Sequence, residues 1–109
     1  MSFSPDEVLP AMIAAAKVPL LNGWAAARPV VTQQLSAIAL QTEHISNQLA
    51  LGKITQAEAA ELFAMEQDAA TSILAEVEGV GKITAESAIN AAIDAVGGMI
   101  NGAVGFALV

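Results

Sequence analysis

The sequence contains no cysteine, one histidine and only four basic side chains. Without cysteine, the chain can form neither disulfides nor thiolate metal sites. Nucleic-acid binding requires clustered lysine and arginine to neutralise phosphates, whereas the basic residues here are spread singly along the chain. They are Lys17, Arg28, Lys53 and Lys82. These absences exclude thiol chemistry and argue against a nucleic-acid partner.

Catalytic motifs are also lacking. No serine stands in a nucleophile-elbow context. Ser36, Ser46, Ser72 and Ser87 all fall within expected helices, where serine usually faces solvent or a neighbouring helix. The glycines between residues 97 and 105 neither follow a strand nor open a helix, so a phosphate-binding loop is unsupported. We therefore predict a non-enzymatic protein that uses no cofactor.

Hydrophobic residues, by contrast, are abundant. They make up 55% of the chain and charged residues 14%, against roughly 45–50% and about 25% in average globular domains. Much of the apolar content is alanine, which favours helix but buries little area per residue. A single helical domain over residues 1–109 would therefore have a thin core and apolar surface left over. Self-association or a hydrophobic partner would cover that surface.

The chain is acidic, with a net charge of −7. This charge disfavours electrostatic attraction to an anionic membrane surface. The first ten residues carry acidic side chains where a signal peptide carries basic ones, so we expect no secretory signal and favour a cytoplasmic location.

Capping and breaking residues predict the first helix at about residues 5–17. Ser4 stands at the N-cap position with Glu7 three residues later, which is the pattern of a capping box. Pro10 lies too deep for the first turn and predicts a kink. Residues 18–23 are typical of a connector.

Two longer helices are expected over residues 25–51 and 55–78. The first carries a heptad seam typical of a packed helical hairpin: Val31, Leu35, Ile38, Thr42, Ile45 and Leu49. Thr55 and Glu58 predict a capping box at the start of the second. Its expected apolar stripe is Leu62, Met65, Ala69, Ile73 and Val77, widened by Phe63, Ala70 and Leu74.

A tetrapeptide recurs before two of the expected helices. Gly-Lys-Ile-Thr occupies residues 52–55 and again residues 81–84. Each copy combines a glycine that can end a helix with a threonine that can begin one. The repeat is explained either by two loops with the same turn geometry or by duplication of a helix-turn unit.

The last helix, expected over residues 84–107, is apolar around most of its circumference. Such a helix is buried in protein or in lipid. Residues 88–109 would extend roughly 33 Å as a helix, enough to cross a bilayer, and Gly98 and Gly102 would permit close helix packing. However, Asp94 lies inside that span and no basic anchor follows it. We favour burial in a protein assembly, with membrane insertion and a frayed or broken tail as alternatives.

The acidic side chains suggest one metal site. If the two middle helices fold back on each other, His44 lies opposite Glu61, and Glu58 shares a face with Glu61. A cross-hairpin ion pair or solvated side chains explain these residues better, because the Glu-x-x-His motif of bundle metal sites is absent.

Together these patterns predict an all-α, four-helix bundle of helical hairpins, with a kinked N-terminal helix and an apolar Gly/Ala-rich C-terminal helix. The favoured function is that of a structural protein, a self-associating subunit of a homo-oligomer or larger assembly. The alternatives are a membrane-associated protein that inserts residues 88–109 and a carboxylate-rich metal-binding bundle. The expected interface residues are Leu35, Ile38, Ile45, Ile89, Ile93, Val96, Gly98, Ile100, Gly102 and Phe106.

Overall fold

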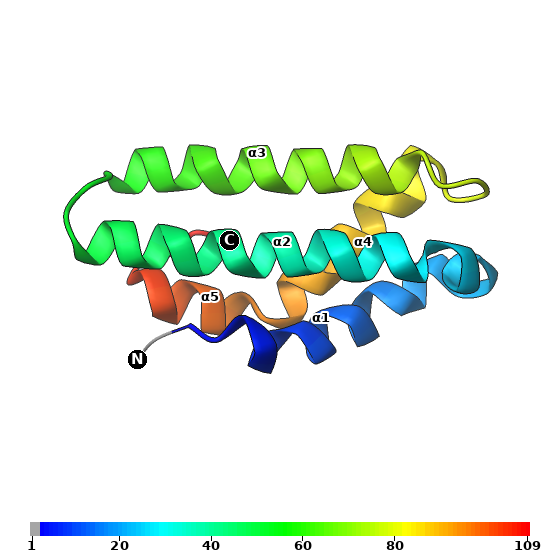
Figure 1. Ribbon diagram of the computed structural model, residues 1–109, viewed down its shortest axis with the longest axis horizontal. Helices are drawn as coiled ribbons and strands as arrows, with labels where there is room; N and C mark the ends of the chain where they lie inside the picture. Colours follow the sequence, from blue (N-terminus) through cyan, green and yellow to red (C-terminus); the bar gives the residue numbers. More distant parts are fainter. Residues whose placement is uncertain (1–2) are drawn as a thin grey trace.

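The computed structural model describes residues 3–109, which form a four-helix bundle with a short additional helix (Figure 1). The elements are α1 (Pro5–Leu20), the 3₁₀-helix η1 (Leu21–Gly23), α2 (Trp24–Ala50), α3 (Gln56–Ala75), α4 (Gly81–Ala95) and α5 (Gly97–Val104). Helices α1 to α4 pack in a closed ring: α1 on α2, α2 on α3, α3 on α4, and α4 back on α1. The predicted all-α, four-helix class is therefore confirmed.

The core is built from the seam predicted for the second helix and from an alanine-rich face of α4. Five of the six seam residues are buried, and Leu49 is partly buried. Helix α4 contributes Ala85, Ala88, Ile89, Ala92 and Ile93. Alanine at three of these positions lets neighbouring backbones approach closely, and α4 accordingly packs against both α1 and α3.

Helix α1 passes through both of its internal prolines. It continues to Leu20 rather than ending near residue 17, and η1 follows it directly, so the predicted connector 18–23 is largely helical. The predicted N-terminal capping box does not form: within the described residues, Ser4 makes no side-chain capping bond. Its carbonyl accepts the Glu7 and Val8 amides instead, at 3.1 and 3.3 Å.

The buried face of α3 differs from the predicted stripe. Ala59, Phe63, Ala70 and Leu74 are buried, whereas Met65 and Ile73 are exposed. The periodicity was ambiguous because apolar residues occupy both faces of this helix. Contacts with α2 and α4 select the face that carries the aromatic ring.

The two Gly-Lys-Ile-Thr copies adopt different structures. Gly52 and Gly81 both have positive φ, at 69° and 74°. Residues 52–55 form a loop that ends in the predicted capping box, with Thr55 and Glu58 exchanging bonds of 3.0 and 3.1 Å. Residues 81–84 already form the first turn of α4. The repeat therefore reflects a shared need for a glycine, not a shared helix-turn unit.

The last helix is broken, against the prediction of one helix over 84–107. Helix α4 ends at Ala95, Val96 leaves helical geometry at φ −120° and ψ 13°, and α5 begins at Gly97. Two consecutive glycines follow Val96, and glycine lowers the helical stability that would carry the chain straight through. The break turns α5 back towards α2, on which it packs.

Candidate interaction surface

Most of the predicted interface residues belong to the core of a single chain. Leu35, Ile38, Ile45, Ile89, Ile93, Val96 and Ile100 are all buried. In this conformation they cannot also contact a second molecule. The sequence distinguishes an apolar face from a polar one but not a core face from an interface face, since both are apolar. Gly98, Gly102 and Phe106 retain exposed or partly exposed surface.

The exposed glycines line a groove between α5 and the start of α1. The groove has a volume of about 250 Å³ and is mostly apolar. Its lining residues are Phe3, Ser4, Glu7, Val8, Gly98, Met99, Gly102 and Ala103. We call it the α5 groove. Met99 is 49% exposed at its edge, and Glu7 is the charged side chain that lines it.

A second hollow borders α5 on its other side, towards the end of α2. It has a volume of about 450 Å³, and Gly102 and Ala103 line it as well. Ser46 of α2 donates a hydrogen bond of 3.1 Å to the carbonyl of Ala103 and so ties the two helices together. Helix α5 therefore borders both hollows, and we call its exposed strip of Gly98, Met99 and Gly102 the ridge of α5.

The two glycines of this ridge serve no visible packing purpose inside the chain. No heavy atom of the described residues beyond the adjoining backbone lies within 4 Å of where a Cβ would stand on Gly98 or Gly102. Both also lie outside the positive-φ positions that favour glycine. Because glycine weakens a helix by up to about 1 kcal/mol relative to alanine, it is costly at these positions.

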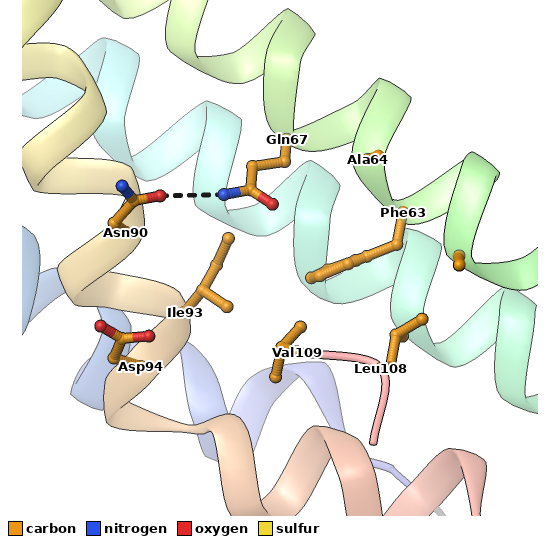
Figure 2. Close-up of a pocket in the computed structure, with 9 residues that line it drawn as sticks. Phe63, Ala64, Gln67, Asn90, Ile93, Asp94, Leu108 and Val109 are labelled. Carbon is orange, nitrogen blue, oxygen red and sulfur yellow. Dashed lines mark hydrogen bonds between the residues drawn. The ribbon is translucent and has the colours of Figure 1, made fainter. Parts of the chain in front are cut away.

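The segment after α5 lines one side of a pocket between α3 and α4 (Figure 2). Leu108 lies towards Phe63 of α3, and Val109 lies towards Ile93 of α4. The Asn101 side chain holds this tail: its Oδ1 accepts the amides of Leu108 and Val109 at 2.8 and 3.0 Å, and its Nδ2 donates to the Val109 carbonyl at 3.2 Å. We call these three hydrogen bonds the tail clasp. The sequence did not predict it, because an asparagine seven residues before an apolar end is only a weak signal for such bonds.

A further hollow between α3 and α4 is lined mainly by polar and charged side chains. Asp68, Lys82 and Glu86 are among its lining residues, and Gln67 donates a 2.9 Å hydrogen bond to Asn90 across it. The single histidine, His44, is exposed on α2 and does not line this hollow.

The three candidate metal ligands do not form a common site. His44, Glu58 and Glu61 are all exposed, and the Glu58 carboxylate accepts the Thr55 amide in the capping box. In the part of the chain that the structure describes, no three histidine or acidic side chains are grouped so that they could hold a metal ion.

The membrane-spanning alternative for residues 88–109 loses its continuous helix, because α4 and α5 have 15 and 8 residues. By length and hydropathy, the stretch that could cross a membrane is instead Pro5–Ala50, and 22% of its most apolar 18-residue segment is buried. This is weak evidence for a span, but it identifies α1 and the turn after it as unusually apolar and exposed.

Comparisons of the chain with protein-family models, with characterised proteins and with solved structures find no match.

Proposed function

We propose that this protein is a non-enzymatic structural protein that self-associates through α5, with a second copy packing on the ridge formed by Gly98 and Gly102. The open space beside both glycines supports this proposal. Gly98 and Gly102 lie one turn apart on α5, and the described part of the chain leaves room for a side chain at both positions. In membrane proteins, glycines at this spacing let another helix approach closely.

The distribution of charge favours a second copy at this site. Two chains of net charge −7 repel each other over most of their surfaces. From Ala95 to Val109, however, no side chain is charged. Helix α5 is therefore a place where two copies can meet with little like-charge repulsion, provided that Glu7 stays at the edge of the contact.

The geometry of the ridge also suits a symmetric contact. In a two-fold dimer the same surface of each copy faces the other. A helix with a glycine pair can lie against its own copy at short distance, and the exposed Met99 side chain of each copy can enter the α5 groove of the other. Methionine adapts well to such irregular apolar gaps.

Substitution at Gly102 tests the proposal because stability and association should change in opposite directions. Gly102→Ala is expected to raise the free energy of unfolding by about 0.5–1 kcal/mol, since helix propensity improves and no described atom obstructs the new methyl group. The same substitution should weaken association, and Gly102→Leu should abolish it. Sedimentation velocity over a concentration series measures the association, and urea unfolding measures the stability.

Ala57→Leu is the matched control, because Ala57 is exposed on α3, whereas α5 packs on α2. It should leave the particle mass unchanged. A wild-type protein that sediments as a monomer at every concentration would contradict the proposal. So would a Gly102→Leu variant that assembles like the wild type.

A further inference from the structure

Three of the most exposed aliphatic side chains lie at one end of the bundle. Val18 of α1, Leu21 of η1 and Ile83 of α4 are 69%, 74% and 82% exposed. Figure 1 shows that the turn from α1 to α2 and the connection from α3 to α4 occupy the same end of the long axis. We call this region the η1 end, defined by Val18, Leu21 and Ile83.

The backbone at Leu21 is strained so that its side chain points outward. Leu21 has φ 47° and ψ −119°, and it is the non-glycine residue with positive φ in residues 3–109. Such backbone geometry is costly for a leucine. A glycine would adopt it more easily, but the nearest glycine is Gly23, two positions later. An exposed, strained leucine contributes little to the fold, and strain of this kind is concentrated at functional positions.

Three of the four basic side chains of this acidic chain lie near the same end. Lys17, Arg28 and Lys82 flank the exposed aliphatic side chains, whereas Lys53 lies in the α2–α3 loop at the opposite end. The Lys17 ammonium stands 5.9 Å from the centre of the Trp24 ring, which is partly buried beside the turn. Tryptophan and lysine beside protruding aliphatic residues are the side chains that proteins place at the boundary between hydrocarbon and water.

Carboxylates are present at the η1 end as well, and they bear on which kind of surface this end could bind. Glu76 and Glu78 are exposed in the loop after α3, Glu86 is exposed on α4, and Asp68 lines the same hollow as Lys82 and Glu86. The η1 end therefore carries charges of both signs and is not a basic patch. A zwitterionic headgroup, which presents both a phosphate and an ammonium, complements such a surface better than an anionic one does.

We propose that the η1 end binds the surface of a zwitterionic lipid bilayer, with Val18, Leu21 and Ile83 entering the acyl region and Lys17 and Trp24 at headgroup level. Each of the three side chains is more than two-thirds exposed, and none lines any of the hollows described above, so a deformable bilayer can surround them where a rigid protein surface would need a separate pocket for each. The binding is peripheral and reversible, because three aliphatic side chains bury less area than a lipid anchor does.

Flotation with phosphatidylcholine vesicles tests the proposal. The wild-type protein should float with these vesicles, and an equimolar mixture with phosphatidylserine should bind no better. The emission of Trp24, the only tryptophan, should shift to shorter wavelength on binding. Leu21→Gly should weaken vesicle binding about tenfold, since one buried leucine contributes roughly that factor. Glycine also relieves the positive φ, so this variant should remain folded.

Leu51→Ser is the matched control, because Leu51 is 66% exposed at the opposite end of the bundle. It should bind vesicles like the wild type, and so should Gly102→Leu, which separates this proposal from self-association through α5. Three results would overturn the proposal: failure of the wild type to float, binding only when phosphatidylserine is present, or equal losses for Leu21→Gly and Leu51→Ser. A Leu21→Gly variant that loses self-association but keeps vesicle binding would also overturn it and assign the η1 end to a protein contact.

Discussion

Thr42 is the one polar side chain buried in the core of residues 3–109. Its position in the heptad seam of α2 was predictable from spacing alone, because a threonine there replaces an aliphatic residue of similar size. Its hydroxyl donates a 2.9 Å bond to the carbonyl of Ile38, one turn earlier. The side chain thus satisfies its own hydroxyl and presents its methyl group to the core.

Substitutions at Thr42 should separate the roles of the methyl group and the hydroxyl. Thr42→Ser removes only the buried methyl group, and we expect a loss of about 1 kcal/mol in the free energy of unfolding. Thr42→Val removes the hydroxyl together with its local bond and should change stability by less than about 1 kcal/mol. Urea unfolding measures both. A larger loss for valine than for serine would contradict this account.

Among the helices, the starts were more predictable than the buried faces. Pro5 and the Thr55–Glu58 pair placed two N-termini almost correctly, because capping depends on residues next to each other in sequence. The face of α3 and the break after Ala95 were mispredicted, since each depends on which helices lie alongside. The same reason explains why seven predicted interface residues prove to be core.

The two predicted caps provide a paired stability test. Thr55→Ala should lower the free energy of unfolding by about 1 kcal/mol, because it removes a hydroxyl that accepts the Glu58 amide. Ser4→Ala should cost clearly less, because the Ser4 carbonyl, not its hydroxyl, receives the first amides of α1. Thermal unfolding of the two variants makes the comparison. Equal losses would show that Ser4 caps α1 through its side chain after all.

The tail clasp yields a prediction for the segment after α5. Asn101→Ala removes the three hydrogen bonds between the Asn101 side chain and the tail. We expect exchange of the Val109 amide to accelerate about tenfold or more, because its acceptor is lost, whereas the Leu108 amide keeps its 2.9 Å bond to the Phe106 carbonyl and should accelerate less. Gln67→Ala is the control, since it breaks a bond to Asn90 beside the same pocket and removes no hydrogen bond to the tail. Unchanged exchange in Asn101→Ala would mean that apolar contacts alone hold the tail.

At the scale of the whole molecule, one chain covers its core almost as well as an ordinary monomer does. It exposes 5995 Å², against about 5,700 Å² expected for a folded monomer of this mass. Large apolar side chains nevertheless stay exposed at several places: Met99 on α5, the η1 end, the outer face of α3 that carries Met65 and Ile73, and Leu40 and Leu51 on α2 and just after it.

Salt should strengthen self-association if copies meet through the uncharged α5. The long-range repulsion between two chains of net charge −7 weakens as ionic strength rises, with a screening length of about 10 Å at 0.1 M and 3 Å at 1 M. Sedimentation equilibrium in increasing sodium chloride should show a falling dissociation constant. Gly102→Leu should remain monomeric throughout. Association that weakens with salt would point instead to a contact held by ion pairs.

Closure of the ring by α1 and α4 joins segments far apart in the chain. The buried face of α1, which includes Met12 and Ala16, packs in a ring that only α4 completes. During synthesis, residues 5–75 emerge from the ribosome before this closing helix is available. The buried face of α1 in the nascent chain consequently stays in contact with water, or with a chaperone, until α4 leaves the exit tunnel.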